Sequence, residues 1–272
     1  MDSGRRWVQS MIRRGLSPQT IKRRRNTYQR FELWLGSDPR KATEADITAW
    51  LDSLAVGPDT RGHYTGDLAA YYQWARRHGH RPDDPTELIE RPRRRKRLPR
   101  PIAHADLAMA LELAGPQTRV ILALASLAGL RAMDIARLSW SDVDLGADVL
   151  WVRDSKGGSD RVVPICRDLR AELVRWGVRT RGPVVPRQDG GYYRPGTISA
   201  YICRFFRDAG IPAQLHACRH FFATELVSEG SDVTVVAELM GHASLQTTRG
   251  YARVAGRAKR AAVATLVLPV AS

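Results

Sequence analysis

Five prolines and a run of five basic residues share one stretch, positions 82–101 of this 272-residue chain. Proline fixes the backbone φ angle and has no N–H to donate, so this density of proline excludes a continuous helix or a central strand. Adjacent like charges repel one another and favour an extended backbone. The stretch therefore predicts a linker between two separately folded parts, residues 1–81 and residues 102–272.

The net charge of +15 is unevenly distributed along the chain. Residues 1–100 contain 22 Lys and Arg against 12 Asp and Glu, a net charge of +10, whereas residues 101–272 contain 21 against 16, a net charge of +5. A concentrated basic excess is typical of a surface that binds a polyanion such as nucleic acid. The alternative is a solvated basic surface, as in proteins from arginine-rich proteomes.

Residues 1–81 have the apolar periodicity of a small, all-helical domain. Ser17 followed by Pro18 is typical of a helix start, and that helix is expected to run to about position 35. Thr43 with Asp46 predicts a capping box. Further helices are expected over residues 7–14, from 43 to 54, and from 59 to about 79. Aromatic residues recur here at helical spacing, so we expect them in the core and not on a base-stacking surface.

Two basic clusters are candidates for contact with the phosphates of a nucleic acid. The clusters are Lys22, Arg23, Arg24 and Arg25 near the start of the second helix, and Arg93, Arg94, Arg95, Lys96 and Arg97 in the linker. Phosphate neutralisation by such residues gives affinity that does not depend on sequence and falls steeply with salt. The alternatives are a solvated helix face for the first cluster and a plain tether for the second.

The second part of the chain predicts a helical domain with one small sheet. A nearly all-apolar run over residues 120–130 predicts a buried helix, and Arg131 follows where that helix ends. Segments 149–153 and 161–165 are rich in β-branched residues and enclose a glycine-bearing loop, which predicts an antiparallel hairpin. Further helices are expected over residues 106–114, 134–138, 169–176 and 197–209. The expected fold class is therefore mainly α, with a small antiparallel sheet in the second domain.

Polar residues cluster after position 215. His216 and Arg219 are three residues apart, so on a helix they share one face. A short amphipathic helix is expected over residues 233–240, and Gly241 ends it in the left-handed conformation. His242 is therefore held at a fixed exit point, and a following helix is expected to carry Tyr251.

Arginine, histidine-x-x-arginine, glycine-histidine and tyrosine thus follow one another in a set order. This order resembles that of the tyrosine recombinases, the phage-integrase and Xer-type site-specific DNA recombinases. The resemblance covers residues 102–255 by motif and the whole chain by domain layout. It implies a core-binding domain in residues 1–81 and a catalytic domain in residues 102–272, which together form a C-shaped clamp on duplex DNA.

Breaking a phosphodiester without metal requires cations that follow the growing negative charge of the transition state. Arginine suits this task because its planar fork stays protonated and donates two hydrogen bonds to phosphate oxygens. Arg131 and Arg219 are our two candidate phosphate clamps. Asp134 stands where many members of the resembled family carry glutamate, and we interpret it as a support for Arg131.

The resemblance implies the other catalytic roles. Tyr251 attacks phosphorus to give a 3′-phosphotyrosyl intermediate, and Lys156, on the hairpin loop, protonates the leaving 5′ oxygen. His216 accepts or relays the tyrosine proton, and His242 hydrogen-bonds the phosphate. The implied function is cleavage and rejoining of DNA strands at specific sites.

No cofactor is expected. The sequence has no GxxxxGK[ST] phosphate loop and no acidic cluster that suits magnesium. His216 and His220 have the spacing of a helical zinc pair around Cys218, but Ala217 stands where a zincin needs glutamate, so no metal is expected. Three cysteines without paired spacing favour a reducing cytoplasm, and neither a signal peptide nor a membrane span is expected.

The implied partner is double-stranded DNA with specific core sites, bound by a tetramer of this chain on a DNA synapse. The tail over residues 255–272 packs either on its own domain or on a neighbouring copy. Two other functions stay open: a DNA-binding protein on the same scaffold without strand transfer, and a type IB topoisomerase-like nicking-closing enzyme. The target sequence, the choice among integration, excision, inversion and dimer resolution, and the need for a partner recombinase or accessory factor also stay open.

Overall fold

A computed structural model describes residues 3–92, 98–153 and 160–241. Within these ranges the protein has eleven α-helices, two short 3-10 helices and one three-stranded sheet, which confirms the expected mainly α class. The chain forms two compact units, residues 1–96 and residues 97–272. None of the helices in the described ranges combines the length and hydrophobicity needed to cross a bilayer.

Several sequence predictions fall outside the described ranges. These are the basic cluster Arg93–Arg97, the loop residue Lys156, the site residues His242 and Tyr251, and the tail 255–272.

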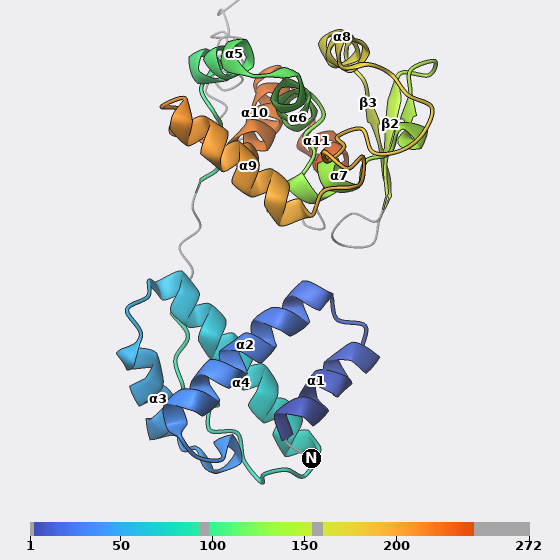
Figure 1. Ribbon diagram of the computed structural model, residues 1–272. Coiled ribbons are helices and arrows are strands. Elements are labelled where there is room, and N and C mark those ends of the chain that lie inside the picture. Colours follow the sequence, from blue (N-terminus) through green and yellow to red (C-terminus); the bar gives the residue numbers. More distant parts are fainter. Residues whose placement is uncertain (1–2, 93–97, 154–159, 242–272) are drawn as a thin grey trace, which may run out of the picture. The chain divides into compact units, whose positions relative to one another are not determined.

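The first unit is a four-helix arrangement in which α2 crosses α4 (Figure 1). Its elements are α1 (Ser3–Arg13), α2 (Pro18–Leu35), the 3-10 helix η1 (Pro39–Lys41), α3 (Glu44–Ser53) and α4 (Pro58–Arg77). The Ser17 side chain accepts a hydrogen bond from the Thr20 N–H at the start of α2. The predicted capping box also forms, because Thr43 and Asp46 accept hydrogen bonds from each other's backbone N–H. Local sequence therefore sets where these helices begin.

The core of the first unit is aromatic, as predicted from the helical spacing. Its fully buried aromatic residues include Trp7, Phe31, Tyr71 and Tyr72. The Trp7 and Tyr71 rings meet edge to face with their centroids 5.3 Å apart. Edge-to-face pairs of this kind stabilise a core beyond the area that they bury. These aromatic residues hold the helices together and do not present a stacking surface for bases.

The second unit is built around α6 (Pro116–Leu127), which packs against both α8 (Arg167–Trp176) and α10 (Leu215–Ser228) (Figure 1). The other helices are α5 (His104–Leu113), α7 (Ala132–Arg137), the 3-10 helix η2 (Trp140–Asp142), α9 (Pro195–Asp208) and α11 (Val233–Met240). Every residue of α6 from Val120 to Ser126 is buried, which confirms the predicted buried helix.

The helix α6 ends at Leu127, three residues earlier than the apolar run suggested. Gly129 takes a φ of 62°, and the N–H of Leu130 donates to the carbonyl of Leu124 at 3.2 Å. This left-handed turn closes the helix while keeping Leu130 buried, so apolar composition alone could not mark the end. The turn delivers Arg131 to the start of α7.

The sheet contains the predicted hairpin and one strand that was not predicted. The strands are β1 (Val143–Asp144), β2 (Val149–Val152) and β3 (Arg161–Pro164), antiparallel in the order β1-β2-β3. Leu150 pairs with Val163 on the buried face, and Trp151 pairs with Val162 on the exposed face. The strand β1 has only two residues, too few for an alternating pattern to show in the sequence.

Gly129 provides a test of the turn after α6. Its positive φ disfavours any side chain, and a Cβ there would lie 2.5 Å from Cδ1 of Phe222. Gly210, after α9, has a similar φ of 67° but no atom within 4 Å of such a Cβ. We expect Gly210→Ala to lower the free energy of unfolding by about 1–2 kcal/mol. Gly129→Ala should lower it by a further ~1–3 kcal/mol.

Denaturant unfolding of the full chain with each substitution measures this difference. Equal losses for the two variants would show that close packing against Phe222 does not hold the turn.

Candidate active site

Arg131 occupies the boundary between the α6 turn and α7. It is the N-cap of α7, with φ −78° and ψ 158°. Its backbone N–H donates to Oδ2 of Asp134 at 3.0 Å, which closes the first turn of the helix. Asp134 is buried, and its carboxylate also lies 4.0 Å from the Arg131 guanidinium. The backbone of this arginine is therefore fixed by a carboxylate three residues ahead.

Arg219 lies on α10 and is almost fully buried, with 1% of its surface exposed. Its guanidinium donates to the carbonyl of Gly129, in the turn after α6, and to the carbonyl of Met240 at 2.5 Å. Arg131 donates from its Nη2 to the carbonyl of Gly241 at 2.9 Å. The two candidate phosphate clamps therefore meet at one place, the C-terminal end of α11.

A third arginine reaches the same helix end. Nε of Arg161, the first residue of β3, donates to the carbonyl of Leu239 at 2.9 Å. Arg161, Arg219 and Arg131 thus donate to three consecutive carbonyls, those of residues 239, 240 and 241. The last carbonyls of a helix have no partner within it and carry the negative end of its dipole, so guanidinium groups stabilise them.

Arg161 begins a segment that the sequence predicts as a strand, and no functional role was predicted for it. Arg161 is 9% exposed, and its Nη2 donates to Oδ2 of Asp134 at 2.7 Å. Asp134 therefore supports Arg131 at the backbone, but its closest guanidinium partner is Arg161. One signal was present in the sequence: Arg161 shares the inward register of Val163, and a charged residue at an inward position needs a buried partner.

His216 and His220 stand one turn apart on α10 with their ring centroids 4.3 Å from each other at 72°. Burial, with the charges of Arg219 and Arg131, lowers the pKa of His216, although part of the residue stays exposed. Burial, with His216 and Arg219, lowers the pKa of His220 to about 4. Both imidazoles are therefore neutral at pH 7, and a neutral imidazole can accept a proton.

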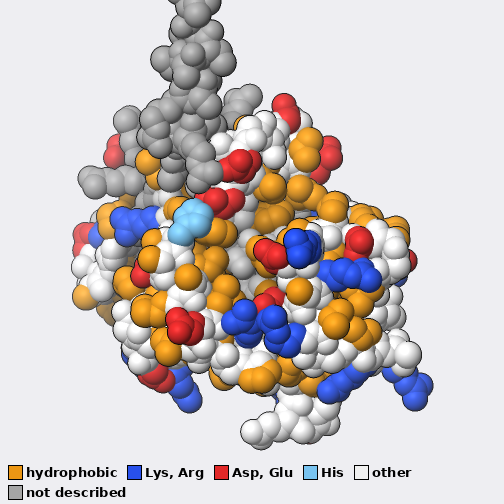
Figure 2. All heavy atoms as spheres, turned by 90° about the horizontal axis from the view of Figure 1, so that it is seen from above, with side chains coloured by type: hydrophobic (Ala, Val, Ile, Leu, Met, Phe, Trp, Pro, Cys, Tyr) orange, Lys and Arg blue, Asp and Glu red, His pale blue; other side chains and the backbone are white. Residues whose placement is uncertain are grey.

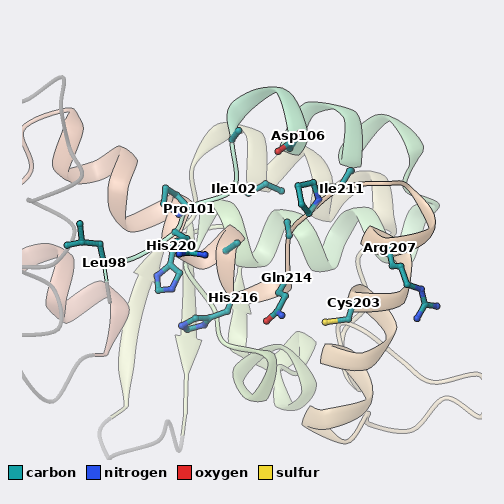
Figure 3. Close-up of a pocket in the computed structure, with 15 residues that line it drawn as sticks. Leu98, Pro101, Ile102, Asp106, Cys203, Arg207, Ile211, Gln214, His216 and His220 are labelled. Atoms are coloured by element: carbon teal, nitrogen blue, oxygen red, sulfur yellow. The ribbon is translucent and has the colours of Figure 1, made fainter. Parts of the chain in front are cut away.

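A cavity of about 860 Å³ opens beside the two histidines. Figure 3 shows His216 and His220 from α10 along it, with Cys203 and Arg207 of α9 lining its other side, and Pro101 also lines it. His216 is thus reachable from outside the unit.

No zinc site was expected at His216 and His220. In the described part of the chain, no group of three or more His, Cys, Asp or Glu side chains is arranged to hold a metal ion. Cys218 is fully buried in the core, and burial raises the pKa of its thiol to about 12. It packs as a small apolar group.

The first basic cluster lies on α2 beside α4. Arg23 donates from Nε and Nη2 to the buried carboxylate of Asp67 at 3.1 and 2.7 Å, and Arg24 lies 3.8 Å from the same carboxylate. Lys22 and Arg25 are exposed. An open cavity of about 300 Å³ is lined by Arg23, Arg24, Asp67, Arg91, Pro92, His63, Gly62 and Gly66. The long-range pair with Asp67 was not predicted, because no sequence pattern links α2 to α4.

The face of the molecule shown in Figure 2 differs from the basic cluster on α2 in how its charged side chains are distributed. Basic and acidic side chains alternate on it, with apolar side chains between them. The excess of positive charge is therefore not gathered on this face.

Residues 103–257 match the Phage integrase family. The chain is 29% identical over 276 residues to tyrosine recombinase XerC 2 of Ralstonia nicotianae, a match that covers 90% of this chain and 80% of that protein. It is 30% identical over 269 residues to tyrosine recombinase XerD of Pseudomonas putida, covering 90% and 89%.

The fold is similar to that of lambda integrase. The TM-score is 0.77 at 19% identity against a dimer bound to a COC′ core site, covering 93% of this chain and 94% of that one. It is 0.74 at 20% identity against a tetramer bound to a Holliday junction, covering 89% and 76%. At this identity the likeness concerns the mainly α fold and its small sheet.

The lowered pKa of His220 predicts a pH dependence of stability. Its pKa is about 4 in the folded protein, below the ordinary value of 6.5. The unfolded chain therefore binds the proton first, so the free energy of unfolding is largest above about pH 6.5 and falls as the pH is lowered towards 4. We expect the His220 ring to titrate near pH 4 by NMR, and His220→Asn to weaken the acid dependence. A midpoint at or above 6.5 would contradict this.

Proposed function

The chain belongs to the phage integrase family, the tyrosine recombinases, and acts in site-specific DNA recombination, and we propose that it cleaves and rejoins DNA strands through a 3′-phosphotyrosyl intermediate on Tyr251. The resemblance inferred from the sequence is confirmed by the family match. The observation that carries the proposal is the convergence of Arg131 and Arg219 on the end of α11, immediately before His242.

The two arginines serve as the phosphate clamp. Their charges lie close together because both guanidinium groups donate to adjacent carbonyls at the end of one helix. Cations fixed before the substrate arrives need no reorganisation as charge develops in the transition state, which is where such groups lower the barrier most. A buried guanidinium also keeps its proton, because its pKa lies far above neutrality.

The remaining roles follow from the chemistry of a phenol nucleophile. Tyr251 must lose its proton as it attacks phosphorus, and His216 is neutral at pH 7 because burial and the nearby arginines lower its pKa. Lys156 protonates the departing 5′ oxygen, and His242 hydrogen-bonds a phosphate oxygen. The covalent link conserves the energy of the broken phosphodiester, so rejoining requires no nucleotide.

The DNA is held by both units in this proposal. In the first unit, Lys22 and Arg25 are exposed, and Arg23, Arg24 and Arg91 line the cavity beside α4. Gly62 and Gly66 have no side chains there, which leaves room for a sugar–phosphate backbone to approach α4. The linker cluster at residues 93–97 adds further phosphate contacts.

We also propose that several copies act together on specific core sites. Lambda integrase, whose fold this chain shares, has been solved as a tetramer bound to a Holliday junction. Recombination exchanges strands between two duplexes, each cut on both strands, so four nucleophiles are required. Neither alternative function, DNA binding without strand transfer or topoisomerase-like nicking and closing, is favoured by the comparisons.

The test of this function is capture of the covalent intermediate. The full chain is first recovered from cells under denaturing conditions, and the DNA that stays attached to Tyr251 is identified. The sequence of that DNA defines the site for a nicked suicide substrate. We expect an adduct with the intact protein and none with Tyr251→Phe. Arg131→Ala should slow adduct formation by about 10²–10³-fold, because it removes a preorganised donor. Tyr192→Phe, at an exposed tyrosine of the same unit, is the matched control and should leave the adduct unchanged.

Either of two results would overturn the function: no adduct with the intact protein, or an undiminished adduct with Tyr251→Phe. Relaxation of a plasmid without any core site would instead favour the topoisomerase-like alternative.

The linker cluster is tested by salt. Replacing all five residues from Arg93 to Arg97 with glutamine should weaken binding to every DNA sequence. Each lost phosphate contact reduces the slope of log K against log salt by about 0.9. Titrations at several salt concentrations measure that slope, and the rate of cleavage at saturating DNA serves as the control because the proposal gives these residues no role in the chemical step. An unchanged slope would contradict the role.

A further inference from the structure

Arg161 is a buried cation that the proposed chemistry does not use. Its side chain is 7% exposed, and that of its partner Asp134 is 1% exposed. Burying an ion pair costs the hydration of both groups, so a buried pair by itself is weak support for stability. The position of the pair therefore calls for a functional explanation.

This side chain joins three segments that are distant in the sequence. It opens β3, directly after the loop that contains Lys156. Its Nη2 donates to Oδ2 of Asp134 at 2.7 Å, and its Nε donates to the carbonyl of Leu239 near the end of α11 at 2.9 Å.

Asp134 carries the connection on to the phosphate clamp. The oxygen that accepts from Arg161, Oδ2, also accepts the backbone N–H of Arg131 at 3.0 Å. A change at Arg161 therefore acts on the residue that starts α7 and bears one of the two clamp guanidinium groups. The link requires a single carboxylate oxygen and no movement of the helix.

Gly241 lies against the same guanidinium. It has a φ of 59°, and a Cβ built there would lie 3.0 Å from Nη1 and 3.2 Å from Cδ of Arg161. The turn that leads from α11 to His242 thus rests on the Arg161 side chain. The turn is also held by the hydrogen bond from Arg131 to the Gly241 carbonyl and by the backbone N–H of Gly241, which donates to the carbonyl of Glu238 at 2.9 Å.

We propose that Arg161 is a positioning residue for strand cleavage, which holds Arg131 through Asp134 and holds the chain end that leads to His242. We assign it no contact with the DNA phosphate, because its guanidinium is paired with the carboxylate of Asp134 at 2.7 Å and its Nε donates to the carbonyl of Leu239. This inference rests on the proposed function, since it concerns the rate of the same cleavage step.

The prediction is a loss in rate without a loss in DNA affinity. With Arg161→Met, the rate of single-turnover cleavage at saturating DNA should fall by roughly 100-fold, because small displacements of a catalytic group carry losses of that order. The dissociation constant for the core site should change by less than about 3-fold, because the phosphate contacts remain. Arg161→Lys, which keeps the charge but lacks the planar guanidinium whose Nε and Nη2 reach the two acceptors, should retain an intermediate rate.

Two further variants separate positioning from folding. Arg170→Met removes an exposed arginine that pairs with Asp148 in the same unit, and it is the matched control expected to cleave like the intact protein. Adding Asp134→Glu to Arg161→Lys lengthens the carboxylate by one methylene and should recover part of the lost rate. Glutamate also fits the capping position that Asp134 occupies. Thermal unfolding of each variant fixes a temperature at which all are folded.

The rates and affinities of these variants decide whether Arg161 is a positioning residue. Cleavage at the rate of the intact protein by folded Arg161→Lys overturns the inference, and this variant serves if Arg161→Met does not fold. Loss of DNA affinity in proportion to rate also overturns it, since Arg161 would then bind the substrate. If the intact protein forms no covalent adduct at all, the proposed function fails first, independently of Arg161.

Discussion

Three guanidinium groups hold the C-terminal end of α11, and they tie this helix to three other elements of the second unit. The helix has only eight residues, too few to be stable alone in water. Val236, Ala237 and Met240 pack it into the unit, while Arg161, Arg219 and Arg131 satisfy its last three carbonyls. Because the donors come from β3, α10 and the start of α7, the helix can end correctly only when those elements are in place.

The same contact gathers three positive charges at one end of α11. Asp134 pairs with Arg161 at 2.7 Å and lies 4.0 Å from the Arg131 guanidinium. The helix carbonyls add partial negative charge. An anion that binds there brings further opposite charge and stabilises the folded state by mass action. A DNA phosphate has this property, which ties the electrostatics of the folded chain to its proposed substrate.

Local features of the fold could be predicted from the sequence, whereas the meeting of distant segments could not. Thr43 with Asp46, and Gly241 after α11, act within one or two turns, and the structure has both as predicted. The site order from Arg131 to Arg219 was found through its resemblance to a family. Arg161 was missed because its partners Asp134 and Leu239 lie 27 and 78 residues away and become neighbours only through packing. The pair of Arg23 with Asp67, 44 residues apart, was missed for the same reason.

The arginines and His216 are electrostatically coupled, which gives the proposed site an order of events. Without DNA, burial and the charges of Arg219 and Arg131 lower the pKa of His216 and keep its imidazole neutral. Burial is the larger cause of that lowering, and a phosphate placed between the arginines offsets the part that comes from their charge, which favours a higher pKa of His216. A base is most effective when its pKa approaches the working pH, so in the proposed mechanism the substrate makes His216 a better acceptor of the tyrosine proton. The charge of the phosphodiester and the basicity of His216 are linked in this way through the two arginines.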